Sequence, residues 1–332
     1  MGLKIAIVGA GAIGGYLGVK LALSGHDVTF VARGENLKAI QAQGMKLELD
    51  TGEVQHAQGV RGCTIDQAGP HDYVFLTMKS HQVEPVAAQL GGLCHSGTAV
   101  VTMQNGVPWW YFHGLPGHEG RQLNSVDPGG KLWQQIGPER VIGSVVYPAA
   151  ELIAPGVVKL IEGNRFTLGE PSGEKSERIT TLAQAMIGAG FKTPVSTDIR
   201  SELWVKLWGN LTFNPVSALT HATLEEICTF GPTRDLAAVM MAEAQGVGEK
   251  LGVQFKIGID KRIAGAQAVG AHKTSMLQDI EAGKALELEA LLGSVIELGH
   301  VVGADTPVLR AVYALTRMLE RQVLAKGHGL TL

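Results

Sequence analysis

An apolar run near the start of the chain leads directly into closely spaced glycines. Residues 4–15 read Lys-Ile-Ala-Ile-Val-Gly-Ala-Gly-Ala-Ile-Gly-Gly, which gives Gly9, Gly11 and Gly14 the spacing G-x-G-x-x-G. A strand, a tight turn and a helix N-terminus with this spacing present backbone N–H groups to a pyrophosphate. Gly9 would form the turn, Gly11 would let the phosphates approach, and Gly14 would let the helix pack on the strand. The alternative is a glycine-rich turn without a ligand, and the flanking strand and helix patterns favour a dinucleotide site.

The end of the second predicted strand, residues 28–32, indicates which dinucleotide binds. An NAD site usually places Asp or Glu there, roughly 20 residues past the glycines. This chain continues Phe-Val-Ala-Arg-Gly, so Arg33 follows the strand and no acid stands at its tip. A planar guanidinium suits a 2′-phosphate. The pattern therefore favours NADP, although Glu35 is nearby and Arg33 could be a solvated turn residue.

Composition limits the classes of function. At 332 residues and 45% hydrophobic, the chain suits two domains better than one core. A net charge of −3 and the lack of a basic block give no electrostatic support for binding nucleic acid. The three cysteines, Cys63, Cys94 and Cys228, are isolated and lack metal-ligand spacing, so we expect a reducing compartment and no metal site.

Residues 5–19 are uncharged and apolar, as in the core of a signal peptide. Glycines interrupt this run, and Lys20 follows before a membrane-spanning length is reached. We therefore expect a cytoplasmic protein with no membrane association.

Strand and helix patterns alternate in the first half of the chain, which is typical of a doubly wound, Rossmann-type parallel sheet. Residues 45–60 indicate a β excursion, and residues 156–168 a hairpin that would extend the sheet with antiparallel edges. After residue 197 only helical periodicity remains. We therefore predict an α/β domain over residues 1–196 that binds the cofactor and an all-α domain over residues 197–332 that binds the substrate. The strands expected in the parallel sheet are 4–8, 28–32, 73–77, 98–103 and 141–146, and the expected later helices are 199–213, 233–251, 260–270, 275–298 and 307–325.

An irregular stretch between Trp109 and Pro138 is rich in Gly, Pro, His and Trp. It is long for a loop in a compact domain. The sequence predicts either a functional lid or a packed surface loop.

One polar row runs along the otherwise apolar helix expected at 199–213 and continues just past it. Glu202, Lys206, Asn210 and Asn214 recur at every fourth residue, so they share one face. A buried lysine and two buried asparagines must find partners or face a ligand. A lysine whose pKa is lowered by burial can act as a general acid toward a carbonyl. The alternatives are a Glu202–Lys206 ion pair and asparagines bound to backbone, and Pro215 is expected to end or kink the helix.

Further candidates lie in two loops and on a later helix. Lys79 and Asn105 follow predicted strands at the ligand-binding edge of the sheet, although either could be an exposed loop residue. Ser275, with Gln278, fits a capping box for the helix at 275–298, but its hydroxyl could also hold a substrate carboxylate. Periodicity alone leaves Glu287 undecided between a solvent-facing and an inward position.

Together these motifs resemble those of the ketopantoate reductases, the NADPH-dependent 2-dehydropantoate 2-reductases of pantothenate synthesis. The similarity covers nearly the whole chain, and its most specific parts are Glu-Leu-Trp-x-Lys-Leu and Ser-Met-Leu-Gln-Asp. The matching segments are Gly9-x-Gly11-x-x-Gly14, Leu76-Thr77-Met78-Lys79, Gln104-Asn105-Gly106, Glu202 to Pro215 and Ser275 to Asp279.

The resemblance implies roles for individual residues. Lys206 would be the general acid that protonates the alkoxide, and Glu287 a functional glutamate that acts on either a substrate hydroxyl or a cofactor ribose. Asn210, Asn214 and Ser275 would bind the polar groups of the 2-oxo acid. The residues expected at NADP are Gly9, Gly11, Ala12, Ile13, Gly14, Arg33, Lys79, Gln82 and Asn105.

The segment Trp109-Trp110-Tyr111-Phe112 and about 25 residues after it depart from the family pattern. These aromatic residues could line or cover a pocket, so a bulkier or aromatic 2-oxo acid is an alternative substrate. A module that senses NADP without catalysis is a second alternative. The long apolar faces of the helical half are compatible with a homodimer as well as with a core.

Overall fold

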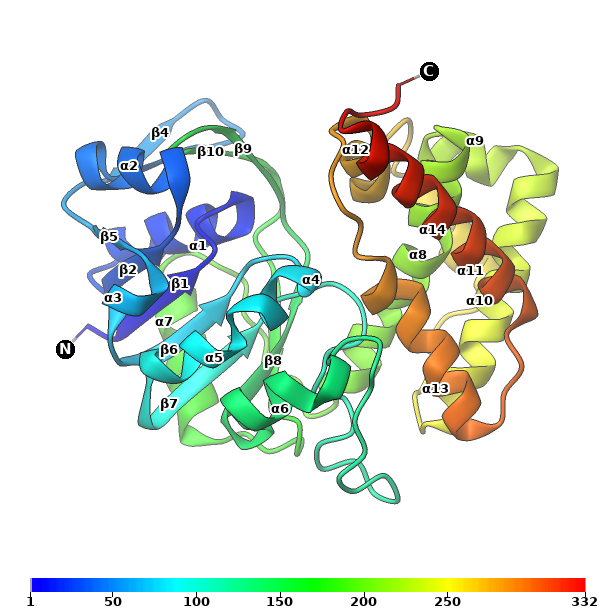
Figure 1. Cartoon of the computed structure of the whole chain (residues 1–332), viewed down its shortest axis with the longest axis horizontal. Coiled ribbons are helices and arrows are strands. Elements are labelled where there is room, and N and C mark those ends of the chain that lie inside the picture. Colours follow the sequence, from blue (N-terminus) through cyan, green and yellow to red (C-terminus); the bar gives the residue numbers. More distant parts are fainter. Residues whose placement is uncertain (1, 332) are drawn as a thin grey trace. The chain divides into compact units, whose positions relative to one another are not determined.

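The computed structural model describes residues 2–331, and the chain forms two compact units (Figure 1). The first comprises Met1–Gln104, Pro108–Gln122 and Gly129–Ile199, and the second comprises Asn105–Val107, Leu123–Pro128 and Arg200–Leu332. Two short segments, 105–107 and 123–128, therefore group with the helical unit although they precede residue 197 in the sequence.

A seven-stranded sheet forms the centre of the first unit, in the order β11-β8-β7-β6-β1-β2-β5. All neighbouring strands pair in parallel except β11, which is antiparallel to β8. The predicted Rossmann-type sheet is therefore confirmed. Its strands are β1 (Lys4–Val8), β2 (Asp27–Val31), β5 (Arg61–Cys63), β6 (His71–Leu76), β7 (Cys94–Thr102), β8 (Val141–Val146) and β11 (Phe166–Gly169).

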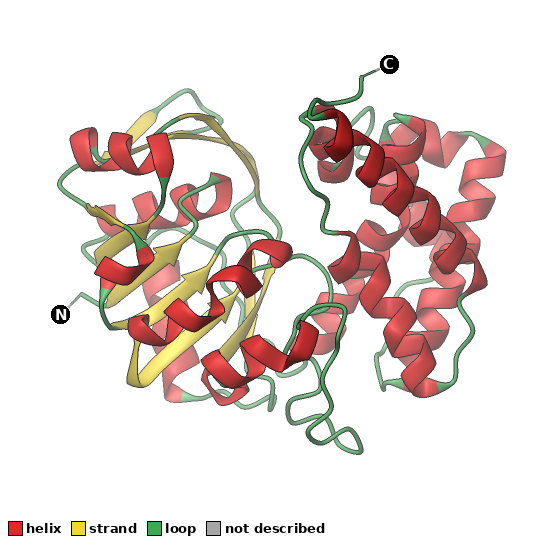
Figure 2. Cartoon of the chain, viewed as in Figure 1, coloured by secondary structure: helices red, strands yellow, loops and turns green. Residues whose placement is uncertain are grey.

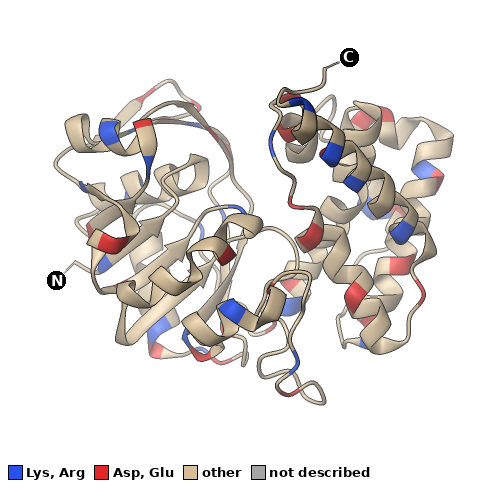
Figure 3. Ribbon diagram, viewed as in Figure 1, with Lys and Arg blue, Asp and Glu red and all other residues tan. Residues whose placement is uncertain are grey.

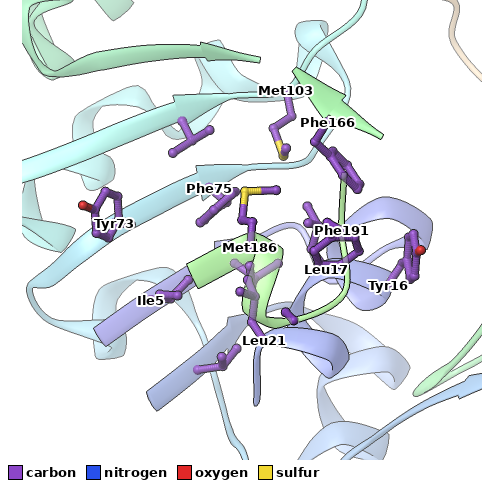
Figure 4. Packing of buried hydrophobic residues seen from close by; sticks show 14 of the residues in the cluster. Ile5, Tyr16, Leu17, Leu21, Tyr73, Phe75, Met103, Phe166, Met186 and Phe191 are labelled. Atoms are coloured by element: carbon purple, nitrogen blue, oxygen red, sulfur yellow. The ribbon is translucent and has the colours of Figure 1, made fainter. Parts of the chain in front are cut away.

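Both faces of this sheet are covered, as strand β6 illustrates. Tyr73 and Phe75 point to one face, where they join a core that includes Leu17 and Met186 (Figure 4). Val74 alternates with them on the opposite face and is also fully buried. Burial on both faces is typical of a parallel sheet between two helical layers.

Helices α1 and α7 contribute to the core shown in Figure 4, whereas α4, α5 and α6 lie on the opposite face of the sheet (Figure 1). Short 3-10 turns connect several of them. The α-helices of this unit are α1 (Ala12–Leu23), α2 (Gly34–Gln43), α3 (Ile65–Ala68), α4 (Ser80–Val83), α5 (Ala87–Leu90), α6 (Lys131–Ile136) and α7 (Glu177–Gly188), and the 3-10 turns are η1 (Glu84–Val86), η2 (Gly91–Leu93), η3 (Pro128–Gly130) and η4 (Pro138–Arg140).

The predicted hairpin at 156–168 is wrong in its partner. The observed hairpin joins β9 (Ala149–Ala154) to β10 (Val157–Glu162), and β10 also pairs in parallel with β3 (Met45–Glu48). With β4 (Val54–Ala57) these strands form a separate four-stranded sheet, in the order β4-β3-β10-β9, that packs on α1. Of the strands predicted in this hairpin, only β11 joins the main sheet, as its antiparallel edge. The prediction failed because the partner of a strand depends on contacts distant in the sequence.

The second unit is helical, and its elements appear without strands in Figure 2. This confirms the all-α character predicted for the C-terminal half. The elements are α8 (Ile199–Thr220), α9 (Leu224–Thr229), α10 (Gly231–Lys250), α11 (Ile259–Gln267), α12 (Ser275–Glu281), the π turn η5 (Glu289–Gly293), α13 (Ser294–Val302) and α14 (Pro307–Lys326).

Two predictions about these helices are corrected. Helix α8 continues through Pro215 to Thr220 instead of ending there. The helix expected over 275–298 is interrupted, since α12 ends at Glu281 and helical structure resumes only next to the π turn at Glu289. Gly283, with a φ of +65°, lies in the gap and accounts for part of this interruption.

Charged side chains of both signs are interspersed along the chain (Figure 3). Within residues 2–331, no helix combines the length and apolar character needed to cross a membrane.

Candidate active site

The glycine turn begins where β1 ends. Gly9 has a φ of +103°, which favours glycine, and its N–H donates to the carbonyl of Val31 over 3.0 Å. At Gly14, an added Cβ would lie 2.2 Å from the carbonyl oxygen of Gly9 and 2.5 Å from Oγ1 of Thr77. Glycine is therefore needed at both positions, in one case for the turn and in the other for the contact between α1 and β1.

Side chains from the neighbouring strands tie this turn to the sheet. The Thr77 hydroxyl donates to the Gly9 carbonyl over 2.7 Å. The Gln104 amide nitrogen donates to the carbonyls of Leu76, at 2.7 Å, and Met78, at 3.1 Å. In these two loops Lys79 and Asn105 are the predicted site residues, whereas Thr77 and Gln104 form the structural ties.

A cavity of about 610 Å³ opens beside the glycine turn, within the first unit. Four of the residues expected at the cofactor line it: Gly9, Gly11, Arg33 and Gln82. Further lining residues come from α2, from the start of α3, and from α4, η1 and α5, and these are Asn36, Thr64, Ile65, Asp66, His81, Pro85, Val86 and Gln89.

Other expected cofactor residues lie outside the lining of this cavity. Ala12, Ile13 and Gly14 lie in the first turn of α1, and Lys79 directly precedes α4. The backbone N–H of Lys79 donates to Oε1 of Gln82, so the two predicted residues are in contact. Asn105 belongs to the helical unit.

The charges around the cavity bear on the choice of nucleotide. Arg33 is exposed after the end of β2, directly before α2, and it lines the cavity together with Asp66. Asn36, which no sequence motif indicated, donates to the Ala10 carbonyl over 2.6 Å and accepts from the Gly156 N–H over 2.7 Å. This polar residue one turn into α2 holds the glycine turn against the second sheet.

The space above Gly11 fits a bound dinucleotide. Gly11 lines the cavity and directly precedes α1. A Cβ built on Gly11 would have no neighbour within 4 Å, so the space beside it is open. The first N–H groups of a helix lack intrahelical partners and attract anions. The residues present therefore fit a pyrophosphate at the start of α1.

The predicted polar row on α8 lies in the helical unit. Lys206 and Asn210 are half-buried and Asn214 is buried, while residues on the other faces, such as Trp204 and Trp208, are almost fully buried. Within residues 2–331 the side-chain amides of Asn210 and Asn214 have no hydrogen-bond partner. These amides are therefore available to a ligand that reaches this face of α8.

Three of the predicted site residues, distant in the sequence, are brought together in this unit. The Lys206 ammonium donates to Oδ1 of Asn105 over 2.7 Å. Nδ2 of the same amide donates to Oε2 of Glu287 over 3.3 Å. The side-chain amide of Asn105 thus bridges Lys206 and Glu287, because its oxygen accepts from the ammonium and its nitrogen donates to the carboxylate.

Burial lowers the pKa of Lys206 from 10.5 to about 8, and the negative charge of Glu287 opposes this by raising it. Desolvation penalises the ammonium, so the group can exchange a proton near neutral pH. The arrangement can supply a proton to an oxygen that gains negative charge nearby.

Ser275 does not cap helix α12. The N-cap of α12 is Thr274, whose hydroxyl accepts from the Leu277 N–H over 3.3 Å. Ser275 is exposed as the first residue of the helix. The interpretation of Ser275 and Gln278 as a capping box is therefore wrong, because the N-cap lies one residue earlier and adjacent hydroxyl residues offer two registers for the cap.

The aromatic segment at 109–112 is buried. Trp109, Trp110, Tyr111 and Phe112 are at most 5% exposed. The Trp110 indole donates to Oγ1 of Thr102 over 2.8 Å, and the Trp109 ring packs edge-on against Trp133. Of the two predicted forms of residues 109–138, these contacts favour packing over a lid for residues 109–112.

Among residues 2–331, no group of three or more His, Cys, Asp or Glu side chains could hold a metal ion.

Comparisons with known proteins give a consistent result. The family model of ketopantoate reductase PanE/ApbA matches residues 5–113, and the model of its C-terminal part matches residues 198–320. A 2-dehydropantoate 2-reductase from Mesorhizobium japonicum is 57% identical over 96% of this chain and 98% of its own length.

Solved structures agree with these sequence matches. A Ralstonia solanacearum protein assigned to the ketopantoate reductases has a TM-score of 0.92 and 38% identity, covering 96% of this chain and 98% of its own. A 2-dehydropantoate 2-reductase from Geobacter metallireducens has a TM-score of 0.82 and 28% identity, covering 95% and 99%.

Proposed function

The chain belongs to the ketopantoate reductase family, and from this premise we propose that it reduces 2-dehydropantoate to pantoate with NADPH, a step of pantothenate synthesis. The observation that carries this proposal is the hydrogen-bonded group of Lys206, Asn105 and Glu287. The 57% identical relative from Mesorhizobium japonicum, named for the same reaction, supports the choice of substrate.

The first unit would hold the nucleotide. N–H groups at the start of α1 would bind the pyrophosphate, with Gly9, Gly11 and Gly14 allowing its approach. Arg33 would bind the 2′-phosphate, because its guanidinium matches phosphate oxygens in pairs and no acid stands at the end of β2 to bind a ribose hydroxyl. We assign Ala12, Ile13, Lys79 and Gln82 to the same cofactor.

When bound, NADPH supplies a hydride to the 2-oxo carbon of the substrate. Lys206 would donate its proton to the carbonyl oxygen as that oxygen becomes a hydroxyl. Its pKa of about 8 lets it carry the proton at neutral pH and still release it. Asn105 would orient the ammonium through its 2.7 Å hydrogen bond, and Glu287 would hold the amide of Asn105 in place.

The remaining polar residues would bind the substrate. Asn210 and Asn214 continue the Lys206 face of α8, so their amides can bind the carboxylate and hydroxyl groups of a small 2-oxo acid. Ser275 would bind the carboxylate with its exposed hydroxyl. The burial of residues 109–112 favours 2-dehydropantoate over a bulky aromatic acid, since these rings are already packed in the protein.

Replacing Lys206 with alanine tests this proposal. We expect kcat for 2-dehydropantoate to fall by about 10²–10⁴-fold, the usual contribution of a general acid. Lys261→Ala, which removes an exposed lysine of α11, is the matched control and should keep wild-type turnover. Turnover of Lys206→Ala within a few-fold of wild type would refute the assigned role. A higher kcat/KM of the wild type for phenyl-bearing 2-oxo acids would refute the substrate.

A further inference from the structure

The segment after Asn105 packs directly against the π turn η5. The Val107 N–H donates to the carbonyl oxygen of Ala290 over 2.8 Å. Gly106 has a φ of +92°, and a Cβ added there would lie 2.2 Å from the same oxygen. Only glycine permits this close approach of the two backbones.

The π turn makes the Ala290 carbonyl available for this contact. In an α-helix that carbonyl would accept from the N–H of Ser294. Here the Ser294 N–H donates to the backbone carbonyl of Glu289, five residues back. The Ala290 carbonyl instead accepts from Val107 and from the hydroxyl of Ser294, over 2.7 Å.

The same two segments also carry the candidate catalytic group. Asn105 lies two residues before Val107, and Glu287 lies three residues before Ala290. Their side chains are joined at 3.3 Å, so the segments are held by one backbone bond and one side-chain bond. A shift of the Ala290 carbonyl would therefore move Asn105 and Glu287 relative to Lys206.

We propose that Ser294 is a positioning residue: its hydroxyl holds the Ala290 carbonyl in the π register, where that carbonyl binds Val107 and keeps Asn105 and Glu287 at Lys206. This inference rests on the proposed function of Lys206 as proton donor. Ser294 itself is fully buried and acts through the backbone.

A purely structural serine would behave differently, and the chain offers a matched comparison. Thr316 on α14 is also fully buried, and its hydroxyl donates to a carbonyl four residues back, that of Val312, over 2.8 Å. It does so within a regular α-helix. Loss of either hydroxyl removes the same kind of hydrogen bond, but only Ser294 bonds the carbonyl that holds Val107.

The first experiment compares Ser294→Ala with Thr316→Val. We expect kcat to fall about tenfold in Ser294→Ala with KM for NADPH changed less than about twofold, as for a displaced catalytic group. Thr316→Val should leave both constants unchanged. An equal effect of the two variants, or none from Ser294→Ala, would overturn the proposal.

The second measurement follows the lysine without substrate or cofactor. NMR of protein labelled with ¹³C at lysine Cε reports the titration of Lys206. Glu287 is the charged group that raises its pKa, and Glu202 is the acid one turn earlier on α8. If Ser294→Ala moves the Glu287 carboxylate away from Lys206, the pKa of Lys206 should fall below the wild-type value of about 8. An unchanged or raised pKa would contradict the inference.

A double-mutant cycle tests the route of the effect. In the Asn105→Ala background, Ser294→Ala should change kcat by less than about twofold, because coupled residues are not additive. Full additivity would refute positioning through Asn105. If Ser294→Ala does not fold, Ser294→Cys keeps nearly the same volume with a weak donor and should show the same changes in smaller degree.

These arms separate the two proposals. Wild-type protein that fails to reduce 2-dehydropantoate would refute the proposed function. The NMR titration would still decide whether Ser294 sets the surroundings of Lys206.

Discussion

Lys206 and Asn105 are 101 residues apart in the sequence, yet the lysine ammonium donates to the amide oxygen over 2.7 Å. The other end of the amide binds Glu287, so its orientation is fixed from both sides. This relationship places the lysine ammonium beside a fixed amide oxygen and near the negative charge of Glu287. The titration of Lys206 can therefore be followed through the pH dependence of the reaction.

The first prediction concerns pH. Reduction needs the protonated lysine, and that form is lost as pH rises through a pKa of about 8. We expect kcat to be constant at lower pH and to fall about tenfold for each pH unit above the pKa. A steady-state profile at saturating substrate and NADPH measures this alkaline limb.

Glu287→Gln is the control for this profile. Since the carboxylate raises the pKa of Lys206, its removal should move the alkaline limb to lower pH. A limb close to 10.5, the ordinary lysine value, would show that burial does not shift the group.

The second prediction concerns the cofactor. Arg33→Ala should raise KM for NADPH by about 10- to 100-fold and leave KM for NADH nearly unchanged, because only NADPH carries the 2′-phosphate. Lys38→Ala removes a neighbouring positive charge on α2 that is paired with Glu35, and it should have little effect. Parallel changes for the two nucleotides would exclude the assigned role of Arg33.

Asp66 lines the same cavity and provides a test of opposite sign. Asp66→Asn removes a negative charge near the proposed phosphate, so KM for NADPH should decrease.

The third prediction concerns stability. Glu170 is buried, with its side chain 5% exposed. Its carboxylate accepts hydrogen bonds from Arg178, one from Nε at 2.8 Å and one from Nη2 at 2.6 Å. Arg178→Met leaves this carboxylate without its ion partner and should lower the free energy of unfolding by about 3 kcal/mol. Urea denaturation monitored by circular dichroism measures the loss.

An exposed pair is the comparison. Arg234 binds Asp260, whose side chain is 88% exposed. Arg234→Met should therefore cost less than about 1 kcal/mol. Similar losses in the two variants would show that burial of Glu170 does not decide the effect.

Much of the first unit could be predicted from local pattern. Strand β1 has the predicted bounds, Lys4–Val8, because an apolar run that stops at a glycine turn is informative over a few residues. For strand β10, by contrast, the local pattern predicts the wrong sheet. Its pairing with β3, about a hundred residues earlier, depends on contacts that no local pattern encodes.

The candidate site divides in the same way. Periodicity alone placed Lys206, Asn210 and Asn214 on one helix face, since an α-helix repeats every 3.6 residues. It left Glu287 undecided, because the helix expected over 275–298 is interrupted before this residue and a π turn follows it.

The sequence by itself determined the glycine turn, the arginine that follows β2 and the polar face of α8, because each depends on spacing within one or two local elements. Only the tertiary structure decided that Asn105 meets Lys206 and Glu287, and that the Ala290 carbonyl turns toward Val107. These contacts join segments more than a hundred residues apart, so they form only when the packing of the helical unit brings the segments together.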